Sequence, residues 1–208
     1  LKNWFTKIIK LSSFLTFPMM IGLTVVAHPL IQVLFGEKWI PMVPYFQILC
    51  LAGLTFPHRA INLNILKVVG RSDLFLRLDI LKIIVGLISI GFVIAMELGI
   101  YGLLWCSFFN THFAFFVNSL FSKRYVSYST KDQFLDMVPS LIASGLMGAV
   151  MYLAGRVSPF GMYVNLLLQI LVGFTVYVFA CKVMRIRELN TMIQISKSLI
   201  ARLTNRRR

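Results

Sequence analysis

Three ionisable side chains lie inside apolar stretches of this sequence, where a charge is costly. Arg59 follows Pro57 and His58 in one stretch, and Asp79 and Lys82 lie in the next. An isolated charge near the centre of a hydrocarbon layer costs at least about 2.5–3.5 kcal/mol, so a charged partner or a water-filled cavity is expected. Basic side chains in such a cavity would attract an anionic group.

The spacing of these charges predicts that they reach a similar depth. Arg59 lies eleven residues before Gly70, and Lys82 lies eleven residues after Arg71. In helices, both would lie roughly 16 Å from the polar turn that joins the two stretches. In one arrangement, Arg59 and Lys82 line a cationic cavity that receives an anionic headgroup. In the other, Arg59 pairs with Asp79 and holds the helices together, while Lys82 extends towards the interface.

Pro57 and His58, which precede Arg59, affect the shape and the possible protonation of this stretch. Pro57 removes a backbone hydrogen bond and bends the helix, which is tolerated where a helix lines a cavity or meets its neighbours. His58 could titrate and take part in proton coupling, although a packed or interfacial histidine is the alternative. Asp79, His58 and Pro57 are therefore predicted to be structural or coupling partners of the two basic residues.

The sequence shows no pattern typical of a catalytic site. It contains no glycine-rich phosphate loop, no metal-ligand cluster and no plausible Ser/His/Asp set. Its cysteines, Cys50, Cys106 and Cys181, lack metal-ligand spacing and are interpreted as small buried residues. We therefore expect no enzyme activity, no metal and no cofactor, and no ATP-driven pump within this chain.

The elements that position these residues are predicted to be transmembrane helices. Of the 208 residues, 58% are hydrophobic and 13% are charged, whereas soluble domains are about 45–50% apolar and about 25% charged. This composition predicts an all-α integral membrane protein. Six stretches are each long enough to cross about 30 Å of hydrocarbon: residues 11–35, 42–69, 74–96, 100–121, 134–154 and 160–181. A longer polar loop is expected at 122–133.

The distribution of charge predicts the orientation of these helices. Of the basic residues outside the stretches or at their ends, seventeen fall on one side and two, Lys38 and Arg156, on the other. By the positive-inside rule, both termini lie in the cytoplasm. Residues 1–10 then form a cytoplasmic segment, 11–181 the transmembrane region and 182–208 a basic cytoplasmic tail.

The net charge of +14 is accounted for by this basic tail and by the loops, so nucleic acid is not an expected partner. The apolar residues of the tail recur at helical spacing, which favours an amphipathic helix on an anionic leaflet. A disordered tail is the alternative. Ser140, Ser144 and Gly148 recur every four residues, and this small-residue face predicts close helix packing.

A set of short motifs recurs in order between Pro18 and about Leu104. The first stretch carries Pro18 and Gly22 and ends in Leu-Phe-Gly-x-x-Trp. The motifs that follow are apolar–Gln–apolar around Gln47, a Gly-Arg helix end and Gly-x-x-Gly at Gly99 and Gly102. This set resembles the Wzx-type polysaccharide flippases of the multidrug/oligosaccharidyl-lipid/polysaccharide exporter superfamily.

The resemblance implies a function. Such flippases move undecaprenyl-pyrophosphate-linked oligosaccharides across the bacterial inner membrane by alternating access, through a cationic cavity between two lobes. Arg59 and Lys82 have the right charge for such a cavity, although they match no family site motif. The expected partners are membrane lipid and the anionic lipid-linked oligosaccharide.

The resemblance places this chain in the C-terminal lobe. Because the chain also starts at a leucine, we expect it to be a piece of a longer protein, inactive without the missing N-terminal lobe. Two alternatives stay open. One is an exporter of the multidrug and toxin extrusion type, and the other is a membrane scaffold for polysaccharide synthesis that transports nothing.

Overall fold

The computed structural model describes the whole chain except residues 1, 158–160, 193, 195–196 and 199–208. Of the described residues, 91% are helical and none lies in a strand. Within the described part of the chain, six helical segments are long and apolar enough to cross a membrane: Lys2–Val25, Glu37–Val68, Ser72–Ala95, Gly99–Val126, Thr130–Val157 and Met162–Val183. The predicted all-α integral membrane fold with six spans is confirmed.

The first predicted span is divided into two helices, α1 (Lys2–Val25) and α2 (Ala27–Phe35). Helix α1 begins at Lys2, so the expected N-terminal segment continues directly into the first spanning helix. Pro29 has no N–H to donate to the carbonyl of Val25, which explains why the hydrogen-bond ladder of α1 stops there. Gly36 ends α2 with a φ of 87°, a conformation that glycine adopts without steric cost.

The second predicted span is also interrupted. It consists of a short 3₁₀ helix η1 (Glu37–Met42), helix α3 (Val43–Gly53) and helix α4 (Phe56–Val68). Leu54 and Thr55 form the turn between α3 and α4.

The remaining helices are continuous: α5 (Ser72–Ala95), α6 (Gly99–Val126), α7 (Thr130–Val157) and α8 (Met162–Val183). The long loop expected at 122–133 is wrong, because only Ser127–Ser129 separate α6 from α7. Ser127 ends α6 with a left-handed backbone. Ser129 and Asp132 then exchange side-chain and backbone hydrogen bonds of 3.1 and 3.2 Å, a capping box that starts α7 early.

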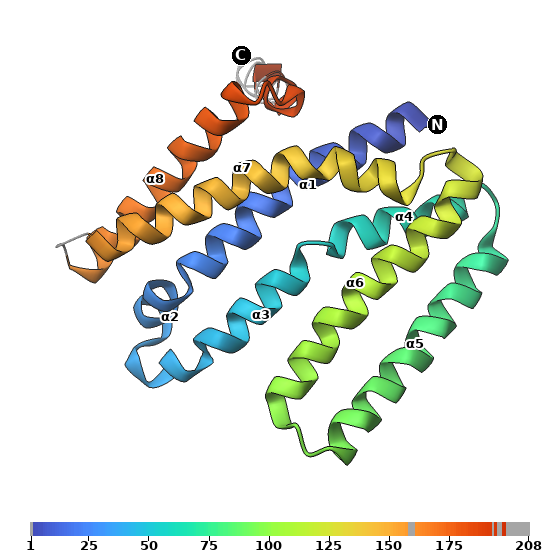
Figure 1. Ribbon diagram of the computed structural model, residues 1–208, viewed down its shortest axis with the longest axis horizontal. Coiled ribbons are helices and arrows are strands. Elements are labelled where there is room, and N and C mark those ends of the chain that lie inside the picture. The colour runs from blue at the N-terminus through green and yellow to red at the C-terminus, as the bar shows by residue number, and fades with distance from the viewer. Residues whose placement is uncertain (1, 158–160, 193, 195–196, 199–208) are drawn as a thin grey trace, which may run out of the picture.

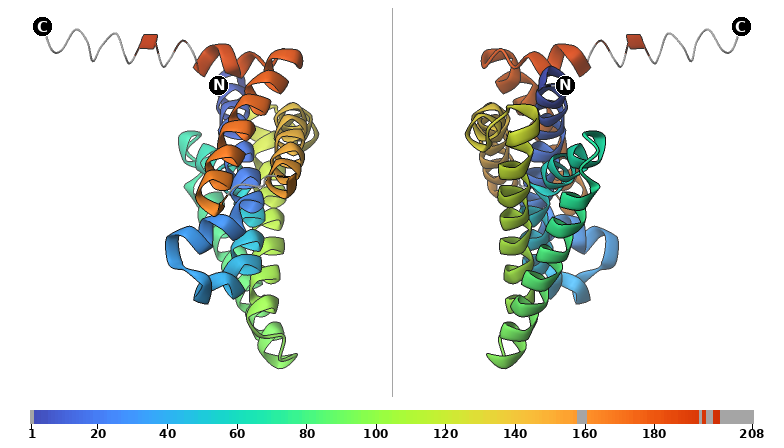
Figure 2. Two further views of the ribbon diagram at one scale, coloured as in Figure 1. Left: turned by 90° about the vertical axis from the view of Figure 1, so that its left-hand side faces the viewer. Right: turned by 90° about the vertical axis from the view of Figure 1, so that its right-hand side faces the viewer.

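The helices form two groups joined by α1. Helix α7 packs between α1 and α8, and α6 packs against α3, α4 and α5 (Figure 1). Helix α1 also contacts α3 and α4, which connects the groups. Figure 2 shows the N-terminus near the α6–α7 connection at one end of the bundle and the α5–α6 turn at the opposite end.

Small residues permit the close approach of α1 and α7. Ser140, Ser144 and Gly148 are all buried on α7. A Cβ atom at Gly148 would lie 2.7 Å from the Cγ2 atom of Ile21 on α1. The predicted packing face therefore exists, and at Gly148 it meets α1.

The start of the tail folds back onto the bundle. Residues 187–192 are helical and lie across the end of the bundle that carries the N-terminus (Figure 2). Ile186 is buried, and Leu189 and Met192 pack against the cluster formed by α1, α7 and α8. The rest of the predicted amphipathic helix, including Ile193, Ile200 and Leu203, lies outside the described residues.

Candidate functional site

The break between α3 and α4 sets the positions of His58 and Arg59. Pro57 occupies the first turn of α4, where its missing N–H costs no helical hydrogen bond. The predicted bend at Pro57 is therefore a complete interruption, followed by a new helix.

His58 is fully buried between three helices. Its Nε2 atom lies 2.8 Å from the hydroxyl oxygen of Ser13 on α1. Its ring lies 5.6 Å from the ring of Phe17 and 6.2 Å from that of Phe115 on α6. These surroundings favour the packed histidine over a titrating one.

Arg59 is half-buried on α4, and its guanidinium carbon lies 4.9 Å from the centre of the Phe56 ring. This distance suits a cation–π contact. The backbone oxygen of Arg59 accepts a hydrogen bond of 3.0 Å from Asn118 on α6. None of the ion pairs among the residues that the structure describes includes Arg59. The Arg59–Asp79 pair of the second arrangement is therefore not formed.

Asp79 pairs with Lys82 on its own helix instead. The Nζ atom of Lys82 lies 3.0 Å from Oδ1 of Asp79, and the Lys82 side chain is only 14% exposed. The pair compensates the charge of a mostly buried lysine. Arg59, on the neighbouring helix, then carries the excess positive charge of the three groups.

A buried polar network lies one turn beyond His58. Asn62 and Gln133 exchange two amide hydrogen bonds of 2.8 and 3.0 Å, which join α4 to α7. Ser122 on α6 donates to Oδ1 of Asn62 at 2.6 Å. All three side chains are fully buried. Because each polar group finds a partner, the network fixes the register of three helices.

The sequence interpretation did not identify this network. The available signal was the four-residue spacing of His58 and Asn62, which places both on one face of a helix. The expected loop at 122–133 includes Gln133, and a residue in a loop is not an expected partner for Asn62.

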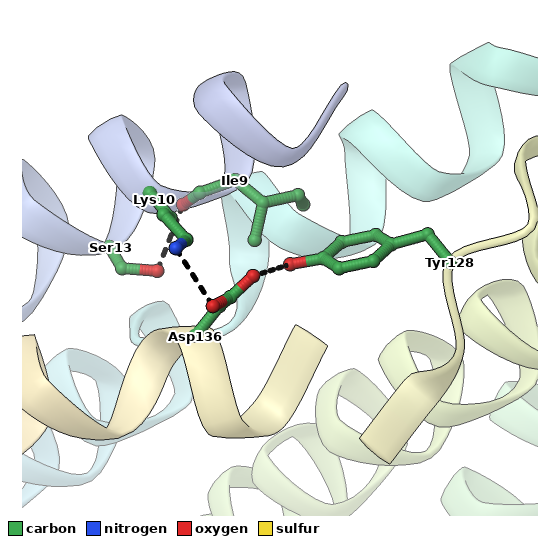
Figure 3. Close-up of polar contacts among 5 residues, drawn as sticks. All are labelled: Ile9, Lys10, Ser13, Tyr128 and Asp136. Carbon is green, nitrogen blue, oxygen red and sulfur yellow. Dashed lines mark hydrogen bonds and ion pairs between the residues drawn. The ribbon is translucent and has the colours of Figure 1, made fainter. Parts of the chain in front are cut away.

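A second polar cluster joins α1 to the start of α7 (Figure 3). The Asp136 carboxylate accepts the Lys10 ammonium at 2.8 Å and the Tyr128 hydroxyl at 2.6 Å, each on a different oxygen. Ser13 donates to the backbone oxygen of Ile9 one turn further along α1. The Tyr128 ring packs edge-on against Phe5 at 5.9 Å. Burial, and then the hydrogen bond to Asp136, raise the pKa of Tyr128, so its hydroxyl keeps the proton that it donates.

This cluster predicts a measurable but modest coupling between Lys10 and Asp136. We expect Lys10→Gln and Asp136→Asn each to lower the melting temperature, with a coupling free energy of about 0.5–1 kcal/mol in the double-mutant cycle. The value is small because both side chains are partly exposed, at 34% and 27%. Thermal unfolding of the purified single and double variants in detergent measures the coupling. Strictly additive effects would contradict the interaction.

Known proteins similar to this chain agree with the resemblance that its sequence motifs indicate. The family described as "Polysaccharide biosynthesis protein" matches residues 1–44. Lipopolysaccharide biosynthesis protein WzxC of Escherichia coli is 29% identical over 154 residues, which cover 71% of this chain and 31% of WzxC. The chain is similar to Wzx-type polysaccharide flippases.

Two further relatives show the same kind of similarity. An uncharacterized membrane protein in the cps region of Klebsiella pneumoniae is 33% identical over 39% of this chain and 17% of its own length. Teichuronic acid biosynthesis protein TuaB of Bacillus subtilis is 32% identical over 36% of the chain and 15% of its own length. The chain thus matches less than a third of the length of each of these three relatives. No solved structure matches it.

Proposed function

We propose that the protein carrying this chain translocates undecaprenyl-pyrophosphate-linked oligosaccharide across the bacterial inner membrane. The translocation occurs by alternating access and supplies lipopolysaccharide, capsule or exopolysaccharide synthesis. The observation that carries the proposal is the similarity to a lipopolysaccharide biosynthesis protein along 71% of the chain. The protein's role is then transport and not catalysis.

The proposed binding residues for the pyrophosphate are Arg59 and Lys82. Arg59 supports this role because it is half-buried in a helical segment that is apolar enough to cross a membrane, and it takes part in none of the ion pairs among the described residues. Lys82 is held by Asp79, and an incoming pyrophosphate would have to compete with that carboxylate. We therefore assign the first contact to Arg59, with Asp79 and Lys82 rearranging afterwards.

The chain would supply one part of the translocation path. As the motif resemblance implies, the chain would form part of a C-terminal lobe that needs an N-terminal lobe of the same protein to transport. Its match to 31% of WzxC supports only that it corresponds to one part of a longer transporter. The bias of seventeen basic residues to two supports an orientation with both termini in the cytoplasm.

An export assay on the full protein tests the role of Arg59. Because a charged hydrogen bond contributes about 1.5–3 kcal/mol, we expect Arg59→Gln to slow export of surface polysaccharide about 10- to 100-fold. Protein levels in the membrane should stay unchanged. Surface polysaccharide is measured in cells in which the variant replaces the natural gene.

The matched control is Arg77→Gln, which removes the same charge from an exposed position on α5. It should export normally. Normal export by Arg59→Gln would remove Arg59 from the site. Normal surface polysaccharide after deletion of the whole gene would instead refute the proposed function and favour a drug exporter.

A further inference from the structure

An apolar groove of about 770 Å³ runs between α1, α7 and α8. Its walls include Phe14, Met19, Met147 and Val178. The Tyr177 hydroxyl, one of the few polar groups in the wall, already donates to the backbone oxygen of Phe14 at 2.7 Å. The groove therefore offers almost no hydrogen-bonding group and suits a hydrocarbon chain.

A second cavity of about 500 Å³ lies where the start of α1 meets the tail. Trp4, Lys7, Ile8 and Leu11 of α1 line it, with Thr191, Gln194 and Ser198 of the tail. The same face of α1 lines both cavities, because Trp4, Ile8, Leu11, Leu15 and Met19 follow one another at steps of three or four residues. The tail also contributes to both cavities, with Met192 in the wall of the groove and Thr191 in the wall of the second cavity.

Positive charge is concentrated at the tail end of this surface. Lys197 lines the groove and Lys7 lines the second cavity. The Lys7 ammonium lies 5.8 Å from the centre of the Trp4 ring. Neither lysine takes part in an ion pair among the described residues. A tryptophan beside unpaired lysines is typical of the membrane interface, where lipid headgroups lie.

We propose that this surface binds one anionic phospholipid. An acyl chain occupies the groove between α1, α7 and α8, and the phosphate lies between Lys7 and Lys197. The apolar wall matches the chain and the two lysines match the charge of the headgroup. The volume of the groove lies within the range of pockets that hold small ligands, which suits a fatty-acyl chain better than the much longer chain of a polyprenyl carrier.

Native mass spectrometry of the full protein in detergent tests the proposal, with phosphatidylglycerol and phosphatidylethanolamine as probes. We expect one phosphatidylglycerol to be retained in preference to phosphatidylethanolamine. Since each lysine near an anionic lipid surface contributes about 1 kcal/mol, the Lys7→Gln/Lys197→Gln double variant should weaken retention at least about 10-fold. The control, Lys123→Gln/Lys131→Gln, removes the same charge from exposed positions outside both cavities and should retain the lipid.

The hydrocarbon part of the site is tested by filling the groove. Val178→Trp should abolish retention, whereas Phe179→Trp should not, because Phe179 is exposed on α8 and does not line the groove. Equal retention of the two lipids, or unchanged retention in the double lysine variant, would overturn the proposal. Displacement of phosphatidylglycerol by equimolar undecaprenyl phosphate would overturn it too, and would assign the groove to the carrier. The readout is lipid binding, so it does not depend on whether the protein exports polysaccharide.

Discussion

Replacing Gly148 with leucine is expected to destabilise the protein by about 1–3 kcal/mol, the usual cost of overpacking a tight interface. A Cβ atom at this position would lie 2.7 Å from Cγ2 of Ile21 and 3.6 Å from Cγ2 of Val25. Both neighbours are β-branched, and their methyl groups cannot swing away without leaving the preferred rotamer. Helices α1 and α7 must therefore move apart along their main contact.

Gly145 provides the matched control. It lies on the same helix, is exposed, and a Cβ atom there would meet no atom within 4 Å. Gly145→Leu removes a helix-interior glycine without a clash, so it should leave stability unchanged or raise it slightly. Thermal unfolding of both variants in the same detergent makes the comparison. Equal destabilisation would show that loss of glycine, and not the approach of α1 to α7, causes the effect.

Replacing Gln133 with leucine is expected to lower stability by about 1–2 kcal/mol. The substitution removes both amide hydrogen bonds of Asn62 to α7. The Oδ1 atom of Asn62 still accepts a hydrogen bond from the Ser122 hydroxyl, and its Nδ2 atom still donates one to the backbone oxygen of His58 at 2.9 Å. The loss is therefore partial, although Asn62 is fully buried and cannot turn to water.

The Asn62→Leu/Gln133→Leu double variant shows whether the loss of stability comes from the broken hydrogen bonds between the two side chains or from poorer packing of leucine. Removing both polar groups leaves fewer unsatisfied atoms than removing one, so the double variant should be more stable than the sum of the single variants predicts. Gln32→Leu is the control, because its bond to Glu37 is exposed and 3.4 Å long. Stability is followed by thermal unfolding. Additive losses at Asn62 and Gln133 would contradict the reciprocal pair.

The number and type of the elements could be predicted from the sequence. A chain in hydrocarbon must satisfy its backbone hydrogen bonds within each segment, so long apolar stretches have to be helical. Length and hydropathy then gave six spans, and the structure contains six. The small residues Ser140, Ser144 and Gly148 also predicted a packing face correctly, because a close approach of helices needs small side chains whichever helix is the partner.

The ends of the helices could be predicted less well. Polar residues at 122–133 suggested a loop, yet Ser129 and Asp132 begin a helix by capping it. Hydropathy measures which residues avoid hydrocarbon, and a polar helical turn avoids it as well as a loop does. Likewise, the helix breaks before Pro29 although the whole first stretch is apolar. Hydropathy alone therefore predicts one continuous span there.

Composition, hydropathy and short motifs are enough to indicate an all-α membrane protein of six spans, a basic side and a resemblance to polysaccharide flippases. Which polar groups meet becomes clear only in the folded bundle. Asp79 pairs with Lys82 and not with Arg59, and Asn62 pairs with Gln133, 71 residues away. The physical reason is that apolar length fixes a helix across the membrane but leaves its rotation about its own axis undefined. That rotation is set by packing against the neighbouring helices.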